Sequence, residues 1–249
     1  MKRSVNELIG YSIQATDGEK GKVYDILFDD ETWIVRYLEA DLGTLFFQKR
    51  VLIPRIYLRE PVWEEKHFPI ELTVKKIENS PDMESDLPFS RKYEKELMEH
   101  YELKPYWPIN IAAHTARKSM LDPDVPLKIP ENTLDEEKIE THLRSFNEII
   151  GYSVHALDER FGHINDLIID DKDWQIIYVI IETKNLLPWG KKVMLPIEKI
   201  HKISFLEREA NVSLSKENIL NAPDYNPAQA INTEYEKVLY DFYGRKIIK

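Results

Sequence analysis

Short hydrophobic runs separated by polar turns dominate the first hundred positions of the chain. Lys22–Phe28 and Trp33–Ala40 are rich in β-branched and aromatic residues, and the polar stretch 29–32 lies between them. Two such runs around a polar turn predict a β-hairpin. Further short strands are expected at Tyr11–Ala15, Val51–Pro54, Ile56–Arg59 and Ile70–Val74. Five or six short strands at this spacing predict a mainly β unit that closes into a small antiparallel barrel.

Helical periodicity is confined to short segments. Ser90–Leu103 carries Tyr93, Leu97 and Tyr101 at i, i+4 and i+8. This spacing predicts an amphipathic helix whose apolar stripe packs on the strands. A single helical turn is expected at Lys75–Asn79.

The same pattern occurs a second time. Arg3–Tyr37 aligns with Arg144–Tyr178 at a constant offset of 141, and 16 of the 35 aligned positions are identical. After one inserted residue the offset becomes 142, which aligns Pro54 with Pro196. The second repeat therefore predicts strands at Ile164–Ile169, Trp174–Ile181 and Val193–Pro196, and helices at Lys216–Asn221 and Asn232–Arg245. Internal repetition of this kind predicts two units with the same fold.

The repeats define the expected domain organisation. Residues 1–104 form the first repeat with its C-terminal helix, and residues 142–249 form the second repeat with its own. Residues 105–141 contain five prolines and are expected to be a linker. We expect the two barrels to pair with each other within the chain, and the fold would also allow a homodimer.

Composition narrows the functional classes. The net charge of −10 argues against a protein whose main task is to bind nucleic acid. Cysteine is absent, which excludes disulfides, thiolate metal sites and cysteine nucleophiles. No apolar stretch follows the charged N-terminus, and no hydrophobic run is long enough for a membrane helix. A bacterial-type cytoplasmic protein is expected.

Catalytic signatures are missing from the sequence. Phosphate-binding glycine loops, nucleophile elbows and zinc-protease motifs do not occur. None of the seven histidines recurs at the equivalent position of the other repeat. We therefore expect no enzyme activity and no cofactor.

Repeated aspartates are the strongest polar signal. Asp25, Asp29 and Asp30 recur as Asp166, Asp170 and Asp171, and Asp173 is added in the second repeat. Clustered carboxylates can hold calcium or magnesium, so the candidate metal ligands are Asp29, Asp30, Asp170, Asp171 and Asp173. The favoured alternative is structural: the turn aspartates bond to their own backbone, and Asp25 and Asp166 satisfy buried amides.

Aromatic and basic residues meet at one hairpin end in each repeat. The candidate partner contacts are Phe46, Phe47, Lys49 and Arg50 in the first repeat, and Trp189, Lys191 and Lys192 in the second. If exposed, these groups could dock a protein or touch an anionic membrane surface. The alternative is that the aromatic ring folds back over the barrel while the cations stay in water.

The repeated motifs resemble the PRC-barrel family, named for the cytoplasmic domain of the photosynthetic reaction-centre H subunit. The resemblance rests on Ile9-Gly10, on Gly21-x-Val23-x-Asp25-x-x-x-Asp29 and on Trp33-x-x-x-Tyr37-Leu38, with counterparts at Ile150-Gly151, Gly162 to Asp170, and Trp174 to Val179. It covers most of both repeats. A related barrel lies at the C-terminal end of a ribosome-maturation factor. The resemblance implies a tandem PRC-barrel protein that assembles with other proteins.

These observations favour a non-catalytic adaptor that binds a protein partner through two PRC-barrel modules. Three alternatives stay open. The resemblance to the H subunit implies an accessory role beside a membrane electron-transfer complex, and the resemblance to the maturation factor implies a role in RNA processing or ribosome assembly. The aspartate clusters predict binding of a small ligand or divalent cation.

Overall fold

The computed structural model of the chain describes residues 1–43, 49–83, 90–106, 142–183 and 190–244. These residues belong to two units. One unit joins Met1–Glu78, here called the first half, to His142–Lys249, called the second half. The other unit is Asn79–Thr141.

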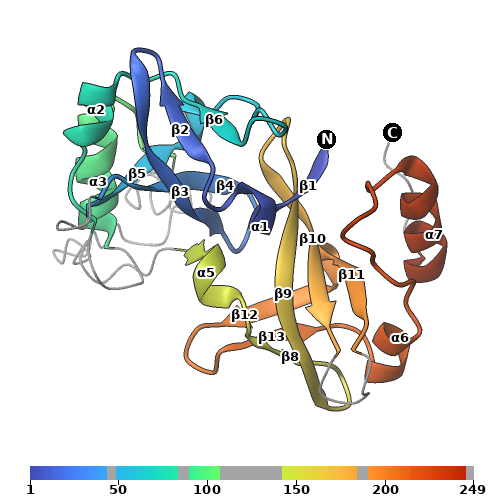
Figure 1. Cartoon of the computed structure of the whole chain (residues 1–249). Coiled ribbons are helices and arrows are strands. Elements are labelled where there is room, and N and C mark those ends of the chain that lie inside the picture. The colour runs from blue at the N-terminus through green and yellow to red at the C-terminus, as the bar shows by residue number, and fades with distance from the viewer. Residues whose placement is uncertain (44–48, 84–89, 107–141, 184–189, 245–249) are drawn as a thin grey trace, which may run out of the picture. The chain divides into compact units, whose positions relative to one another are not determined.

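The first half is mainly β (Figure 1). Its elements are β1 (Lys2–Ser4), α1 (Val5–Leu8), β2 (Ser12–Ala15), β3 (Gly18–Asp29), β4 (Val35–Asp41), β5 (Arg50–Pro54), the 3₁₀ turn η1 (Arg55–Tyr57), β6 (His67–Pro69) and α2 (Val74–Glu78).

The second half repeats this order of elements and contains one strand and one helix in addition. Its elements are β7 (Leu143–Ser145), α5 (Phe146–Ile149), β8 (Ser153–His155), β9 (Arg160–Asp170), β10 (Gln175–Glu182), β11 (Lys192–Pro196), the 3₁₀ turn η3 (Ile197–Lys199), β12 (Ile200–Ser204), β13 (Glu209–Val212), α6 (Lys216–Leu220) and α7 (Thr233–Tyr243). The additional elements are strand β12 and helix α7. Helix α7 is attached to the sheet by the Tyr243 hydroxyl, which donates to the carbonyl oxygen of Met194 at 3.1 Å.

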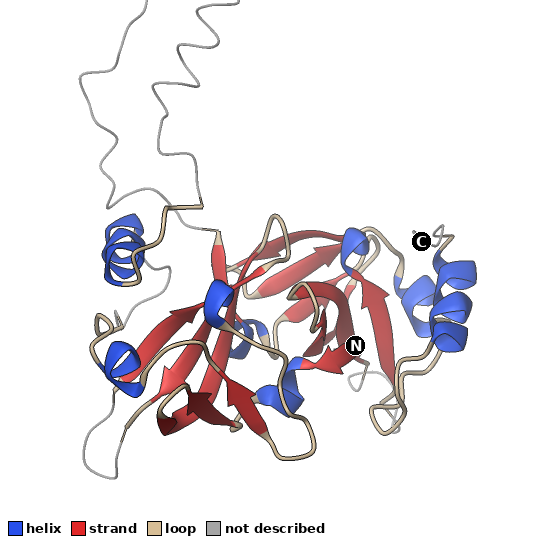
Figure 2. Cartoon of the chain, turned by 90° about the horizontal axis from the view of Figure 1, so that it is seen from above, coloured by secondary structure: helices blue, strands red, loops and turns tan. Residues whose placement is uncertain are grey.

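The strands form two mixed sheets (Figure 2). Their orders are β5-β4-β3-β2-β6 and β11-β10-β9-β8-β13-β12. The prediction of wholly antiparallel strands is wrong at two pairs, because β2–β6 and β8–β13 are parallel. In each pair a long stretch of chain, and not a hairpin, separates the two strands in sequence. Such a connection permits parallel pairing. Among the described strands neither sheet closes on itself, so the predicted closed barrels are not seen.

One strand of each sheet comes from the other half. Strand β1 of the first half pairs antiparallel with β9 of the second, and Figure 1 shows β1 in blue beside β9 in yellow. Strand β7 of the second half pairs in the same way with β3 of the first. The registers match, since Ser4 faces Ile168 and Ser145 faces Leu27. The two halves therefore exchange their N-terminal strands.

Consecutive buried residues explain why the central strands are hydrophobic on both faces. Ile26, Leu27 and Phe28 in β3 have no exposed surface, and neither do Ile168 and Ile169 in β9. A strand that is covered on both faces has no solvent side and shows no polar alternation. This explains the nearly continuous hydrophobic runs of the predicted hairpins.

Two of the sequence-based element predictions need correction. Ile56–Arg59 was predicted as a strand, and the chain instead forms η1 at Arg55–Tyr57. The predicted strand Ile70–Val74 is displaced to β6, at His67–Pro69. Strands β1 and β7 were not predicted, because three residues are too few to produce a visible alternation.

The unit 79–141 contains α3, at Arg91–His100, within the predicted range 90–103. The Ser90 side chain accepts a hydrogen bond from the amide of Tyr93 at 3.1 Å, so Ser90 caps the helix. Thr133-x-x-Glu136 also matches a capping box, and it lies outside the described residues.

Gly21 and Gly162 occupy equivalent left-handed positions, with φ of 75° and 62°. A Cβ atom at Gly162 would lie 2.7 Å from the carbonyl oxygen of Glu182, and one at Gly21 would collide with the carbonyl oxygen of Asp41. Gly10 has φ of 87°, but a Cβ atom there meets nothing within 4 Å.

We expect Gly21→Ala and Gly162→Ala each to lower the free energy of unfolding by about 2–4 kcal/mol, because backbone strain and a clash with backbone act together. Gly10→Ala should cost about 1–2 kcal/mol, since it adds strain without a clash. Urea unfolding measures the difference, and equal losses at all three positions would contradict the packing argument.

Candidate functional site

The repeated Asp25 joins the two halves. Its carboxylate accepts hydrogen bonds from the Ser145 hydroxyl and, at 3.0 Å, from the amide of Asn147. The amide of Ile26 donates to the same carboxylate at 2.7 Å. Asp25 belongs to β3 of the first half, whereas Ser145 and Asn147 begin the second half. The carboxylate therefore fastens the exchanged strand β7 to the sheet.

Asp166 makes the same contacts in the opposite direction. It accepts from the Ser4 hydroxyl at 2.5 Å and from the amide of Asn6 at 3.2 Å. The amide of Leu167 takes the place of Ile26, at 2.8 Å. We call these two sets of contacts the clasps; each consists of one aspartate and the serine and asparagine of the other half.

Each clasp also uses a β-bulge. The ladder between β3 and β4 skips Tyr24, and the ladder between β9 and β10 skips Asn165. The freed carbonyl oxygens accept from the side-chain amides of Asn147 and Asn6, at 2.9 and 3.1 Å. The bulge turns a backbone carbonyl group away from the ladder, so that an asparagine of the other half can donate a hydrogen bond to it.

A sequence signal for these contacts is present and was missed. Ser4-x-x-Glu7 and Ser145-x-x-Glu148 both match a capping box at equivalent positions. The serine oxygens accept from the amides of Glu7 and Glu148 at 3.3 and 3.0 Å, so they cap α1 and α5. Each serine hydroxyl then remains free to donate to the aspartate of the other half.

Burial controls the charge state of the clasp aspartates. Desolvation raises the pKa of Asp25 to about 6, although the three hydrogen bonds oppose the rise. Burial also raises the pKa of Asp166, against the same kind of hydrogen bonds. The two repeated aspartates are therefore structural groups held inside the junction.

Trp33 and Trp174 complete the junction. Both adopt left-handed backbone conformations, with φ of 58° and 59°. The carbonyl oxygen of Trp33 accepts from the amide of Ile176 at 2.8 Å, and that of Trp174 accepts from the amide of Val35 at 2.9 Å. The Trp174 ring stacks on Phe68 of the first half, with centroids 5.3 Å apart. Such strained positions persist only where the surroundings hold them, here through contacts between the halves.

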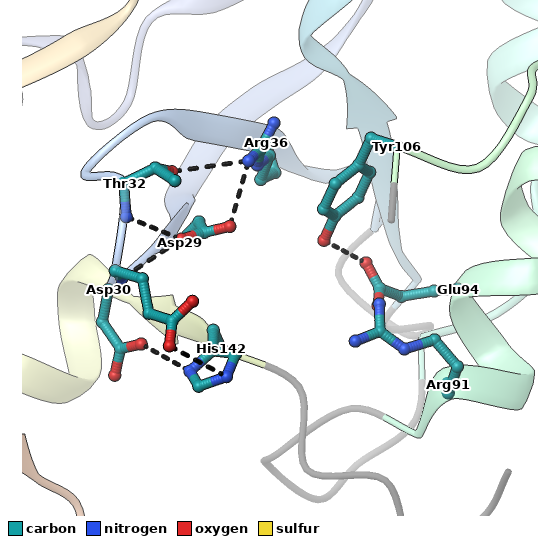
Figure 3. A network of polar contacts seen from close by, with 9 residues as sticks. Asp29, Asp30, Thr32, Arg36, Arg91, Glu94, Tyr106 and His142 are labelled. Carbon is teal, nitrogen blue, oxygen red and sulfur yellow. Dashed lines mark hydrogen bonds and ion pairs between the residues drawn. The ribbon is translucent and has the colours of Figure 1, made fainter. Parts of the chain in front are cut away.

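The first aspartate cluster shapes its turn (Figure 3). Asp29 accepts from the amides of Glu31 and Thr32 and, at 3.0 Å, from Arg36. Burial acts to raise the pKa of Asp29, but the Thr32 amide and the Arg36 guanidinium outweigh it, and the pKa is lowered. The carboxylate is thus held in its charged form by local bonds.

Asp30 turns toward the second half. Its carboxylate lies 2.8 Å from Nε of Arg144 and 3.2 Å from Nδ1 of His142. Figure 3 shows the contact with His142. Desolvation raises the pKa of Asp30, while Arg144 and His142 act to lower it.

The second cluster has equivalent local contacts. Asp170 accepts from the amide of Lys172 at 3.1 Å, and Asp173 accepts from the amide of Gln175 at 3.2 Å. Asp171 is buried and pairs with the α-amino group of Met1. Within the described residues, no group of three or more metal-binding side chains is close enough to hold an ion. The backbone bonds agree with the structural interpretation, and cation binding stays a prediction.

The hairpin-end cations have partners. Lys191 lies 2.9 Å from the Asp224 carboxylate and donates to the carbonyl oxygen of Ala222 at 2.8 Å. Arg50 stacks over the Tyr24 ring at 3.5 Å and lies 3.4 Å from Glu39. Lys49 and Lys192 are half-buried, and Phe46, Phe47 and Trp189 lie outside the described residues.

Glu39 is a buried titratable group that the sequence analysis did not identify. It is 3% exposed and faces Asp25 across the β3–β4 ladder. Burial and the Asp25 carboxylate raise the pKa of Glu39 to about 7, and Arg50 opposes the rise. The register aligns Glu39 with Ile180, which faces Asp166. The buried carboxylate is therefore specific to the first half.

The unit 79–141 has a polar network of its own. Arg91 and the Tyr106 hydroxyl both bind the Glu94 carboxylate, at 2.7 and 2.8 Å (Figure 3). This network fixes the start of α3 to the segment that follows the helix.

Comparison with protein families accounts for the two matching halves. The model of the PRC-barrel domain matches residues 2–74 and again residues 142–219. The chain belongs to the PRC-barrel domain family. A comparison with curated proteins finds no match.

Both PRC-barrel matches include an exchanged strand and a clasp aspartate. The first covers β1 and Asp25, and the second covers β7 and Asp166. Helices α3 and α7 lie outside the matched segments. Among the described helices of this PRC-barrel chain, none combines the length and the hydrophobicity needed to cross a membrane.

A double-mutant cycle of Asp25→Ala and Ser145→Ala should give a coupling energy of about 1–3 kcal/mol, because the hydrogen bond involves a buried carboxylate. The Asp166→Ala and Ser4→Ala cycle should give a similar value. Denaturant unfolding provides the four free energies of each cycle. Additive losses would show that the clasps do not connect the halves energetically.

The raised pKa of Glu39 predicts a pH-dependent stability. Because the folded chain holds this proton up to about pH 7 and the unfolded chain releases it near pH 4, the contribution of Glu39 to stability falls as the pH rises through that window. Glu39→Gln should therefore gain roughly 1–3 kcal/mol at pH 8 relative to its effect at pH 5. Glu64→Gln, at an exposed position, should leave the pH profile unchanged. Parallel profiles for Glu39→Gln and the unaltered chain would refute this assignment.

Proposed function

We propose that this chain is a non-catalytic adaptor whose two PRC-barrel modules hold a protein partner in an assembly. The observation that carries the proposal is that the repeated aspartates are occupied by structural hydrogen bonds. Asp25 and Asp166 are occupied by the clasps, and Asp29 and Asp170 accept bonds from their own turns. An acid–base or nucleophilic site needs groups that are free to meet a substrate, and these are committed to the scaffold.

The proposal also concerns how the two halves form their modules. We propose that the two halves are duplicated barrel modules, and that each exchanged strand completes the module of the other half. This arrangement favours a rigid platform, because the hydrogen bonds of both sheets cross the junction. A cytoplasmic location fits a platform of this kind.

The partner surface that we propose is formed by the two hairpin ends, from Phe46 to Arg50 and from Trp189 to Lys192. Each end combines aromatic residues with cations, the composition that is typical of the centre of a protein interface. The stacking of Arg50 on Tyr24 supports the proposal, since it places a cation and an aromatic ring together beside that hairpin. A membrane surface and an RNA remain alternative partners.

The test is capture of partners from the native host by crosslinking, with three forms of the chain. A partner that binds the unaltered chain should be lost, by at least tenfold, from the variant carrying Phe46→Ser, Phe47→Ser and Trp189→Ser, because the aromatic anchors carry most of the binding energy. Leu206→Ser is the matched control, since Leu206 is 92% exposed and belongs to neither hairpin end.

Equal capture by all three forms would move the interface elsewhere. No captured protein, together with a measurable turnover of any substrate, would overturn the adaptor proposal. Vesicle flotation and RNA binding at several salt concentrations, with the same three forms, separate the two alternative partners from a protein.

A further inference from the structure

The first half contains a cavity of about 640 Å³ beside its exchanged strand. Its lining includes Arg3 from β1, Asn6 and Glu7 from α1, Tyr11, and Trp63 and Lys66 from the segment before β6. The volume falls within the range of ligand-binding cavities, roughly 300–1,000 Å³. None of the residues that line the cavity belongs to the hairpin ends proposed above.

One wall of the cavity is a fixed aromatic and cationic stack. The Arg3 guanidinium lies over the Trp63 ring at 4.7 Å from the centroid. The edge of Tyr11 meets the same ring at 5.8 Å, and the Tyr11 hydroxyl donates to the carbonyl oxygen of Trp63. These contacts hold the indole and the guanidinium in place before any ligand arrives.

Two donors in this stack have no hydrogen-bond partner. Nε of Arg3 and Nε1 of Trp63 are both buried and unpaired. An unpaired buried donor costs about 1–3 kcal/mol, and more when the group is charged. A ligand that accepts hydrogen bonds from these groups would recover that energy.

The remaining charges of the cavity are also unpaired. Lys66 and Glu7 are exposed, and within the described part of the chain neither side chain has an ion-pair partner within 4.0 Å. The backbone holds Lys66 in position, because its carbonyl oxygen accepts from the amide of Ser12 at 3.1 Å and its φ is 54°. The cavity thus presents two cations and one anion to whatever fills it.

The residues at the equivalent positions of the second half have different partners. Arg144, the counterpart of Arg3, pairs with Asp30 at 2.8 Å. Glu148, the counterpart of Glu7, accepts from the Tyr152 hydroxyl at 2.5 Å. The register places Phe205, which has no donor, opposite Trp63, and Arg208 opposite Lys66. The halves therefore differ in the ion pair of the arginine and in the hydrogen bond of the glutamate, whereas Nε of Arg144, like Nε of Arg3, has no hydrogen-bond partner among the described residues.

We infer that this cavity binds a small zwitterion, an amino acid. Its carboxylate is received by Arg3, Lys66 and the Trp63 indole, and its ammonium group is received by Glu7. Planar guanidinium and indole donors suit a carboxylate, which accepts hydrogen bonds in its own plane. Glu7 disfavours a doubly charged phosphate and selects a ligand with a positive group beside its acid.

The test uses the full chain labelled with ¹⁵N, in which each of the five tryptophans gives one indole signal. Trp63→Phe identifies the Trp63 signal and reproduces the residue of the second half. Titration with the twenty common amino acids, one at a time, should shift this signal saturably for at least one of them. For that amino acid, the matching carboxylic acid without the amino group should bind about tenfold more weakly, and the matching amine should not bind.

The variants assign the roles of the charges. Arg3→Lys and Lys66→Ala should each weaken binding by about tenfold or more, as expected for loss of a charge-assisted hydrogen bond. Glu7→Gln should remove the preference for the amino acid over its acid. Arg208→Ala, at the counterpart of Lys66, is the control and should bind as the unaltered chain does. Thermal melting of each variant separates lost binding from lost folding.

Three results would overturn the inference: no amino acid shifts the Trp63 signal, the shift is the same in Lys66→Ala and Arg208→Ala, or inorganic phosphate binds in place of carboxylates. The partner-capture experiment does not depend on this cavity, so the two proposals can fail separately.

Discussion

The exchange of N-terminal strands is the constraint on which the rest of this structure depends. Each sheet is completed by a strand from the other half, and a buried aspartate fastens that strand at each end of the exchange. Removing either strand would expose a sheet edge and leave the amides of Asn6 or Asn147 without their acceptors. The two halves are therefore one folding unit, although a long stretch of sequence separates them.

This dependence explains the chemistry of the aspartates that recur in both halves. A carboxylate that must accept three hydrogen bonds inside a junction is not available for a substrate or a metal ion. Polar side chains outside these structural contacts occur instead at positions where the two halves differ. Glu39 occupies the position of an isoleucine beside one clasp. The cavity contains the Trp63 indole where the second half has a phenylalanine, and it contains Arg3 where the second half has an arginine in an ion pair with Asp30.

Much of the frame could be predicted from residue patterns. The hairpins and the helix near residue 95 follow from hydrophobic runs, turn residues and helical spacing, and both are found. The aspartate clusters were visible as well, but their partners were not, because Arg144 and His142 are distant from Asp30 in the sequence. The cavity was invisible for the same reason, since Arg3 and Trp63 meet only when the chain is folded.

The sequence by itself determined that the chain is mainly β, that it contains the same module pattern twice and that it belongs with the PRC-barrel domains. These properties depend on local patterns and motifs, which can be recognised without knowing the tertiary contacts. Only the tertiary structure decided which half supplies each edge strand. Ser4 and Ser145 lie in similar local sequences, Arg-Ser-Val-Asn and Arg-Ser-Phe-Asn, so either could bond to Asp25 or Asp166, and the choice depends on how the whole chain packs.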